Sequence, residues 1–558
     1  MHDIVPSPTA PPPGPSRGST YTPEVIPRAR PLHSPRSWRR AAVLAAIIAG
    51  LVATTALVAG PGFAAERTAR ILMGEPATLD PAAAGDAGSA AVIAQLFEGL
   101  TAIDPTRTPR PALAERWELR DGGRTVVFTL RDGLQFSDGS PLTADDVRRS
   151  WLRVLDPQAP SPLASLLYDV EGAREYAAGR GDAGAVGIRA DGSTLEVRLT
   201  RPAGDFPAIA ASPTLAVVPP SVGRDPTALQ PGSSFVGSGG YLLAGTATDG
   251  LALKANPRYW AGEPAIGEVT LVSDIGGRSA VDVFAAGDLD WAPVAEFDAS
   301  WLAYDPDLGA SLRRWADLAV TYYGFETGRP PFDDPRVRRA FASAVDWNRI
   351  VGLADGTAAL PATSMVPPGI PGRSDQSFLP AYDPAAARRL LAEAGYADPA
   401  TFPVVTLVTG GSVYDEAILA QLRENLGITV RHEALDFATL FSRLGSEDSP
   451  DMWALSWIAD YPSPNDFLGI LLGSDQPNNY GGWSNAGFDA AIAAAVGTDD
   501  AVKARAGYDA AETILRDEVP TIPVSYGTSA ALAREGLLGA TPNGLGILRL
   551  AGLAWAGR

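Results

Sequence analysis

The chain has 558 residues, of which 46% are hydrophobic and 20% are charged, enough for about three globular lobes with a large core. Its net charge is -19, and this acidic balance repels phosphate backbones, so nucleic acid is not an expected partner. The sequence has no cysteine, which excludes disulfides, thiolate catalysis, cysteine-based metal sites and a lipid-modified cysteine anchor.

The N-terminus contains a predicted export segment. Residues 1–40 are rich in Pro, Ser and Thr and predict a disordered tail. An uncharged apolar run at residues 41–60 follows a pair of arginines, so residues 41–65 read as a signal peptide or a membrane anchor. Both interpretations remain open, and both place the body outside the cytoplasmic membrane because the flanking positive charges stay inside. We therefore expect an extracytoplasmic protein, secreted, periplasmic or anchored through residues 41–60, and not a lipoprotein.

The first part of the body is rich in strand signals. Thr143 is a predicted helix N-cap with Asp146 as its capping-box partner, and Val147, Trp151 and Val154 follow on one side of that helix. Alternating apolar residues between turn signals predict strands or hairpin arms at residues 117–119, 125–130, 195–199, 241–243, 251–254 and 269–272.

Beyond Val320, strands and helices alternate. Asp334-Pro335 predicts a helix start, with the helix continuing to Val351, because proline is favoured in the first helical turn. Asp383-Pro384 predicts a second helix, which Gly395 ends. The remaining expected elements are strands at 320–325, 404–408, 428–431 and 452–457 and helices at 418–426 and 436–444. This order favours an α/β class with a mostly parallel sheet covered by helices.

Few patterns point to an enzyme. His432 is the only histidine beyond the N-terminal 65 residues, and its position at the end of a predicted strand favours a surface residue. The motifs G-x-S-x-G, H-E-x-x-H and G-x-x-x-x-G-K do not occur. A carboxylate-based hydrolase stays open, because 64 acidic residues offer many pairs. We expect no enzyme activity, no cofactor and no metal site.

Asp460 is the best candidate for a binding residue. It stands where a predicted strand ends, between Trp457 and Tyr461, and ligands of open α/β sheets bind outside such carboxyl ends. One carboxylate between aromatic rings suits an ammonium group, through a charge-assisted hydrogen bond and cation–π attraction. The alternative is a turn in which the Asp460 side chain bonds its own backbone, and the spacing alone favours this alternative.

Several ordered motifs carry a resemblance to a known family. The body, from about Ile71 to Val524, resembles the extracytoplasmic solute-binding proteins of family 5, which include the oligopeptide- and dipeptide-binding proteins of ABC importers. Besides the Asp460 segment, the motifs lie at residues 75–81, 96–100, 113–117, 128–133, 136–147, 256–260, 332–338 and 390–396. The resemblance implies a two-lobed flytrap fold, the type II fold of periplasmic binding proteins, with an extra domain inserted in the first lobe. The expected boundaries are 66–97, 213–319 and 518–558 for lobe I, 98–212 for the inserted α/β subdomain and 320–517 for lobe II.

The resemblance also implies the site residues. Asp460 matches the aspartate that pairs with the α-amino group of a peptide, and Ser456 and Ile458 match strand positions whose backbone bonds the peptide. The remaining matches are a facing backbone position in lobe I, two pocket walls and two looser matches near the side chains or carboxylate of the peptide: Asp86, Tyr323, Trp457, Tyr414 and Arg443.

The sequence departs from the family at some of these positions. Leu163 and Ala454 stand where oligopeptide binders have a tyrosine and an arginine, and Val320 and Ile458 stand where some members have cysteines. The expected function is the peptide-capturing component of an ABC importer, a monomer that delivers its ligand to a permease in the cytoplasmic membrane. The alternatives are the same fold with another solute, such as a nickel chelate, an opine, an oligosaccharide or an antibiotic, and a membrane-tethered sensor.

Overall fold

The computed structural model describes residues 68–223, 229, 235–354, 359–411, 414–444, 446, 448–498, 500–543 and 545–557. The predicted tail and the predicted signal or anchor at residues 41–65 lie outside these ranges. Within them, no helix combines the length and the apolar character that crossing a membrane requires.

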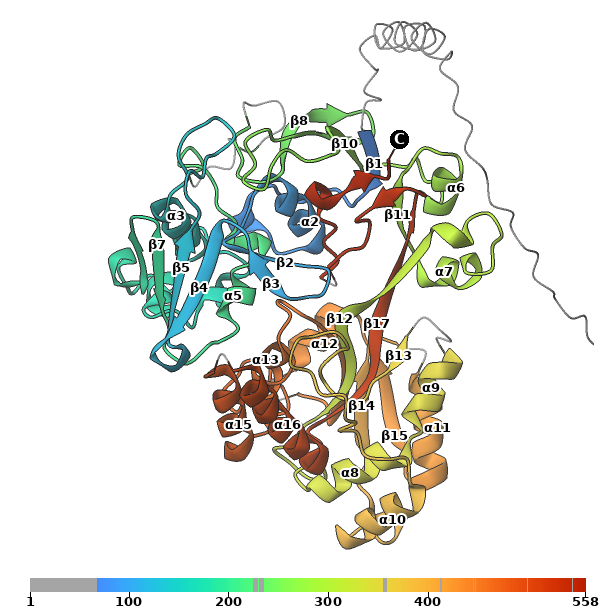
Figure 1. Ribbon diagram of the computed structural model, residues 1–558. Helices are drawn as coiled ribbons and strands as arrows, with labels where there is room; N and C mark the ends of the chain where they lie inside the picture. Colours follow the sequence, from blue (N-terminus) through green and yellow to red (C-terminus); the bar gives the residue numbers. More distant parts are fainter. Residues whose placement is uncertain are drawn as a thin grey trace, which may run out of the picture. The chain divides into compact units, whose positions relative to one another are not determined.

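One large mixed sheet of eleven strands organises the described chain (Figure 1). Its order is β15 (Val430–Ala434), β14 (Val405–Thr409), β16 (Met452–Ile458), β12 (Leu312–Phe325), β17 (Thr521–Ala533), β11 (Trp291–Val294), β1 (Thr68–Leu72), β10 (Glu268–Val272), β9 (Gly250–Ala255) and β8 (Tyr241–Ala247), with β13 (Leu360–Pro361) paired to β17. We call β11, β1, β10, β9 and β8 the first half of the sheet. The second half consists of β13, β14, β15 and β16.

Two long antiparallel strands, β12 and β17, join the two halves. Leu312 pairs with Leu532 beside the first half, and Gly324 pairs with Thr521 beside the second. The register of this pair shifts between Ala316 and Val320, so the ladder is irregular midway along the connection. Because both strands run from one half to the other, the predicted domain boundary after residue 319 falls inside a strand.

A separate sheet of four strands lies in the segment that was expected as an insertion. Its order is β4 (Ala114–Arg120), β5 (Thr125–Leu130), β7 (Thr194–Arg198) and β6 (Ile188–Asp191). Helix α3 (Ala144–Val154) begins at the predicted capping box, where Asp146 Oδ2 accepts the Thr143 N–H at 2.9 Å. The Trp151 ring of α3 packs 5.9 Å from Phe206, so this sheet and its helix enclose a core of their own.

The helices and the short strands complete the fold. In the chain before β12, the helices are α2 (Ala87–Leu96), α4 (Ala173–Ala177), α5 (Phe206–Ile209), α6 (Ala280–Ala285) and α7 (Glu296–Leu302). After β12 they are α8 (Pro335–Ala344), α9 (Trp347–Ala354), α10 (Pro384–Glu393), α11 (Asp415–Leu426), α12 (Phe437–Arg443), α13 (Pro464–Phe467), α14 (Gly469–Leu472), α15 (Ala486–Val496) and α16 (Ala501–Glu518). Two small antiparallel pairs are β2 (Thr101–Ile103) with β3 (Pro109–Pro111) and β18 (Leu537–Leu538) with β19 (Ala554–Trp555).

The structure corrects two expectations. The helix predicted from Pro335 to Val351 is two helices, because the chain is extended at Val345 and Asp346 starts α9 by accepting a hydrogen bond from Arg349 N. The sheet is not mostly parallel: β14 is parallel to β15 and β16, whereas β16 and β17 are each antiparallel to β12, which lies between them. The reason is that β12 and β17 form a long antiparallel pair that links the two halves of the sheet.

Candidate functional site

Strand β16 presents a partly open edge. One edge pairs with β12 along the whole strand, from Ala319 opposite Ile458 to Phe325 opposite Met452. The other edge pairs with β14 only at Met452 and Trp453. From residue 454 to 458 no further strand of the described chain pairs with this edge, so its backbone can accept an added strand.

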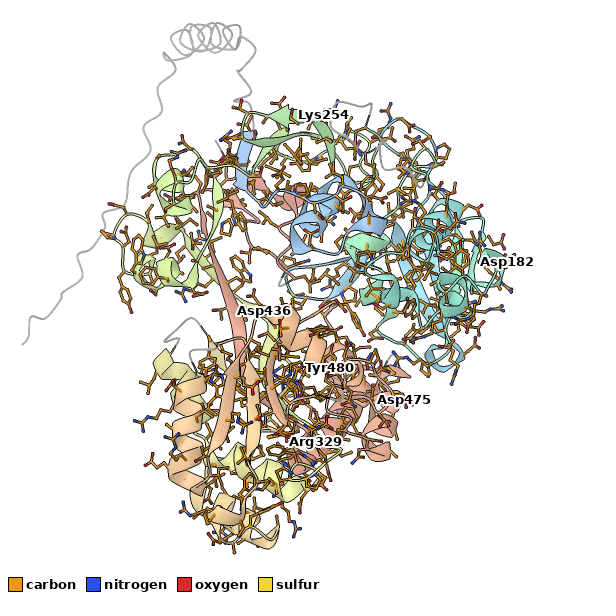
Figure 2. The ribbon with its side chains drawn as sticks, turned by 180° about the vertical axis from the view of Figure 1, so that it is seen from behind. Asp182, Lys254, Arg329, Asp436, Asp475 and Tyr480 are labelled. Carbon is orange, nitrogen blue, oxygen red and sulfur yellow. The ribbon has the colours of Figure 1, made fainter. Side chains whose placement is uncertain are left out.

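The start of β16 is held firmly. The Arg329 guanidinium, labelled in Figure 2, lies 3.1 Å from Asp451 Oδ1 and also donates to the Ser449 carbonyl oxygen at 2.6 Å. The other carboxylate oxygen of Asp451 accepts the Thr406 N–H at 2.9 Å, which ties the strand start to β14. The paired beginning of β16 therefore fixes the direction in which its unpaired end points.

Asp460 follows the unpaired end of β16 directly. Its side chain keeps contact with solvent, although protein atoms crowd around it, and this burial raises the pKa of its carboxyl. Within the described residues nothing donates a hydrogen bond to the Asp460 carboxylate, so the alternative in which it caps its own turn is not observed. Asp460 therefore offers its carboxylate to an incoming group.

Asp466, in α13, lies beneath Asp460. Its Oδ2 accepts hydrogen bonds from Trp457 Nε1 at 2.9 Å and from the Asp460 backbone N–H at 3.3 Å. The Asp466 side chain is fully buried, and burial together with the charge of Asp460 raises its pKa far above the ordinary range of an aspartate. One buried carboxyl thus holds both the aromatic wall and the backbone of the candidate ligand residue.

Residues 460–466 also contact the segment expected as an insertion, residues 98–212. Asn465 Nδ2 donates to Asp205 Oδ2 and to the Tyr461 hydroxyl, both at 3.2 Å. Burial raises the pKa of Asp205, and burial and the nearby Asp205 charge raise the pKa of Tyr461. A second link joins the Gly204 N–H to the Val496 carbonyl oxygen at 2.7 Å.

Three other predicted residues also lie at exposed positions. The Ser456 hydroxyl lies 2.9 Å from that of Thr321 on β12, and the Ile458 side chain is 68% exposed. Asp86 is the N-cap of α2, where its carboxylate accepts the Ser89 N–H at 2.8 Å and its carbonyl oxygen accepts the Ala90 N–H. The hydrogen bond from Ser89 lowers the pKa of Asp86. Its side chain is therefore engaged in capping α2.

The structure does not bring the remaining predicted residues to Asp460. Tyr323 is fully buried in the core beside α8 and α11, where its hydroxyl donates to Asp415 Oδ1 at 3.0 Å. Tyr414 is buried in the same core. Arg443 forms ion pairs with Glu433 at 2.9 Å and Asp448 at 3.3 Å. These three side chains have structural partners of their own, and their roles as ligand contacts stay proposals with less support.

His432 is not a simple surface residue. Its Nε2 lies 3.0 Å from Thr409 Oγ1 and 3.3 Å from Asp415 Oδ2. The Thr409 hydroxyl itself donates to Asp415 Oδ2 at 2.6 Å. Thr409 lies in β14, His432 in β15 and Asp415 in α11. The contacts among these three side chains therefore hold the two strands and the helix together.

Asp466 is the functional candidate that the sequence did not single out. The run Ser463-Pro464-Asn465-Asp466 has the form of a helix start, and Ser463 does cap α13 by accepting the Asn465 N–H at 3.2 Å. That pattern predicts a carboxylate in the first turn that faces the helix backbone. Only the tertiary contact with Trp457 shows that Asp466 serves the neighbouring strand end instead.

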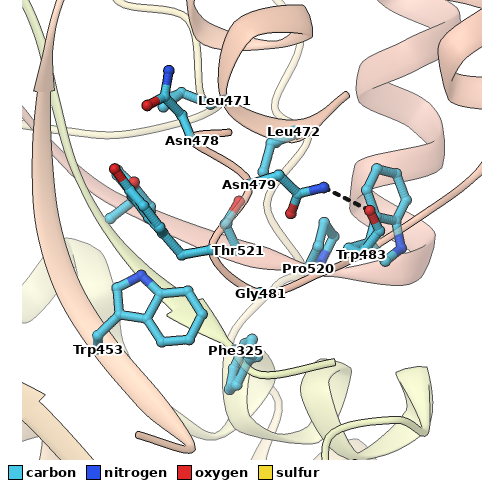
Figure 3. A pocket seen from close by; sticks show the side chains of 12 residues that line it. Phe325, Trp453, Leu471, Leu472, Asn478, Asn479, Gly481, Trp483, Pro520 and Thr521 are labelled. Carbon is cyan, nitrogen blue, oxygen red and sulfur yellow. Dashed lines mark hydrogen bonds between the residues drawn. The ribbon is translucent and has the colours of Figure 1, made fainter. Parts of the chain in front are cut away.

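Two cavities lie away from the predicted site residues. The cavity in Figure 3, lined by Trp453, Tyr480 and Trp483 among others, has a free volume of only about 10 Å³, close to that of one water molecule. Asn479 closes one side of it by donating a hydrogen bond to the Trp483 carbonyl oxygen at 2.6 Å. A larger cavity of about 450 Å³ is lined by residues 73–79 and 246–251 and includes none of the predicted site residues.

Known proteins resemble this chain over most of its length. The family model for bacterial extracellular solute-binding proteins, family 5 (Middle), matches residues 108–479. The probable deoxycholate-binding periplasmic protein YgiS of Escherichia coli (strain K12) is 32% identical over 81% of this chain and 86% of its own length. The periplasmic oligopeptide-binding protein OppA of Salmonella typhimurium is 30% identical over 90% and 95% of the two chains.

Solved structures agree in fold. The unliganded open form of the periplasmic murein tripeptide-binding protein MppA superimposes with a TM-score of 0.78 at 27% identity, and covers 89% of this chain and 98% of its own. The predicted fold class, a two-lobed α/β binding-protein fold, is therefore confirmed.

Proposed function

The chain belongs to the bacterial extracellular solute-binding proteins of family 5, and on that premise we propose that it captures peptides outside the cytoplasmic membrane and delivers them to an ABC permease. The family consists of binding proteins, and the proposal requires no chemical step on the ligand. The protein acts as a monomer in this proposal, and its export depends on residues 41–65.

The open edge of β16 that ends at Asp460 carries the proposal. A peptide backbone that adds to this edge gains hydrogen bonds that do not depend on its side chains, so many sequences fit. Its N-terminal ammonium group reaches Asp460 at the end of the strand, and a charge-assisted hydrogen bond to that carboxylate fixes the direction of the peptide. Trp457 adds an aromatic face beside the ammonium group.

Capture also requires the lobes to close. We place the hinge in β12 and β17, where the register of the pair shifts between Ala316 and Val320. Two strands with an irregular ladder can bend there without breaking the sheet on either side. The similarity to an unliganded open form supports an open state as the starting point for closure.

A second candidate ligand class is an amphipathic carboxylic acid. YgiS, 32% identical to this chain, is named as a probable deoxycholate-binding protein, and Ala454 stands where oligopeptide binders have an arginine. Such a ligand has no ammonium group, so it would bind without using Asp460. The two classes therefore make opposite demands on this residue.

Ligand identification tests the proposal. The exported protein is purified without refolding and denatured, and the released small molecules are identified by mass spectrometry, while the melting temperature is measured with di- to pentapeptides and with deoxycholate. Release of peptides and a melting shift with free-amino peptides support peptide capture. A shift with deoxycholate alone, with no peptide released, transfers the assignment to the second class.

A further inference from the structure

Asp466 occupies an unusual position for a carboxyl group. Its side chain has no exposed surface, and its Oδ2 accepts from both Trp457 Nε1 and Asp460 N. The indole ring and the main chain of the ammonium-binding residue are therefore attached to the same oxygen atom. A displacement of Asp466 moves both parts of the site.

Among the residues that the structure describes, no cation balances Asp466. In the part of the chain that the structure describes, no Arg, Lys or His forms an ion pair with it, and its Oδ1 has no hydrogen-bond partner. The ionisable groups that face Asp466 are Asp460 and the Tyr461 hydroxyl, which follow β16, and Asp205, which lies in the segment expected as an insertion. The nearby Arg201 pairs with Asp169 instead.

This environment favours the neutral form of the carboxyl. A buried carboxylate without a cation loses its hydration and gains no compensating charge, so it keeps its proton. Both neighbouring acids, Asp460 and Asp205, add repulsion in the same direction. A protonated carboxyl still accepts hydrogen bonds at its carbonyl oxygen, so the contacts to Trp457 and Asp460 are retained.

We propose that Asp466 is a positioning residue that holds Trp457 and Asp460 as a neutral carboxylic acid, so that the pair Asp460–Asp466 presents one negative charge to the ligand instead of two. This inference rests on the proposed function. A single negative charge matches the single positive charge of an ammonium group at this position.

Two substitutions distinguish a positioning role of Asp466 from a requirement for its negative charge. Asp466→Asn keeps an oxygen acceptor of the same size and removes the ionisable proton, whereas Asp466→Leu removes the acceptor. Affinity for a free-amino tripeptide is measured by calorimetry at neutral pH. We expect Asp466→Asn to stay within about threefold of the wild type and Asp466→Leu to lose about tenfold or more, which corresponds to lost hydrogen bonds at a charged site. Comparable large losses in both variants would contradict a neutral Asp466.

Stability against pH provides an independent readout. A raised pKa in the folded state means that the folded protein binds the extra proton, so the contribution of Asp466 to stability declines as pH rises above the unfolded pKa, near 3.8. Asp466→Asn lacks this loss. We expect the melting temperature of the wild type to fall relative to Asp466→Asn as the pH is raised above the unfolded pKa of an aspartate. A difference that does not change with pH would overturn the inference.

The binding and the stability measurements also distinguish a failure of the proposed function from a failure of the role assigned to Asp466. If the wild type binds no free-amino peptide, the proposed function fails, and the pH arm still decides whether Asp466 is neutral. If peptides bind but the wild type and Asp466→Asn show the same pH dependence, the function stands and the role of Asp466 is refuted.

Discussion

Glu98 accepts two hydrogen bonds from the guanidinium of Arg549, at 2.8 Å to Oε1 and 2.7 Å to Oε2, although 451 residues separate them in the chain. The Tyr259 hydroxyl donates to the same carboxylate, of which only 1% is exposed. Burial and this carboxylate together raise the pKa of Tyr259. The family motif at residues 96–100 therefore joins the end of α2 to the C-terminal segment, which is an architectural role.

Removing this carboxylate should destabilise the fold. Glu98→Ala leaves the Arg549 guanidinium without its partner, and breaking a buried pair from one side costs about 3–5 kcal/mol. Chemical denaturation measures the loss. The control is Glu118→Ala, whose ion pair with Arg120 is exposed on both sides, so its removal should change the stability little. Equal losses of stability in the two variants would show that the buried Glu98 pair stabilises the fold no more than an exposed pair does.

Glu512 should make stability depend on pH near neutrality. Its side chain in α16 is 2% exposed, and burial raises its pKa from 4.5 to about 7. The folded state therefore holds a proton that the unfolded state releases, so the contribution of Glu512 to stability is greatest below pH 4.5 and is lost as pH rises through about 7.

Glu512→Gln should abolish this loss. Relative to the variant, the wild type should lose about 3 kcal/mol of unfolding free energy between acidic and alkaline pH, at roughly 1.4 kcal/mol per pKa unit. Urea denaturation at several pH values measures it, and Glu424→Gln, an exposed helical glutamate, controls for loss of charge. Parallel curves for the wild type and Glu512→Gln would contradict a shifted Glu512.

Gly239 should tolerate no side chain. A Cβ there would lie 2.4 Å from the Gln95 carbonyl oxygen and 2.6 Å from the Leu96 carbonyl carbon, where the Gly239 N–H bonds the end of α2. Gly239→Ala should cost about 1–3 kcal/mol through overpacking against backbone. Gly267→Ala is the matched control, because no atom lies within 4 Å of its Cβ. A neutral Gly239→Ala in thermal unfolding would refute the close packing.

Local patterns predicted the elements that depend on neighbouring residues. The capping box of Thr143 and Asp146 appears as expected, because its donors and acceptors lie within one turn. The position of Asp460 after a strand was also predicted, since prolines at 462 and 464 end the strand locally. The start of α9 at Asp346 also had a local signal, because an aspartate directly before a helix can cap it. The continuous helical periodicity of the segment concealed this signal.

Long-range contacts decided the rest. The direction of β12 and β17 follows from their passage between the two halves of the sheet, which no window of sequence contains. Tyr323 matches a pocket wall by resemblance, yet its ring packs 5.7 Å from Trp347 inside the core. The role of Asp466 depends on Trp457, nine residues away across a strand end, and on burial by other elements.

The most direct test of the account is calorimetry of one tripeptide with a free amino group and the same tripeptide acetylated, on the wild type, Asp460→Asn and Asp475→Asn. Asp475, labelled in Figure 2, is an exposed aspartate in the same part of the chain and serves as the control. The account predicts that the wild type and Asp475→Asn bind the free-amino peptide about tenfold or more tightly than the acetylated one, and that Asp460→Asn binds both equally weakly. A preference for the free amino group that survives in Asp460→Asn would contradict it.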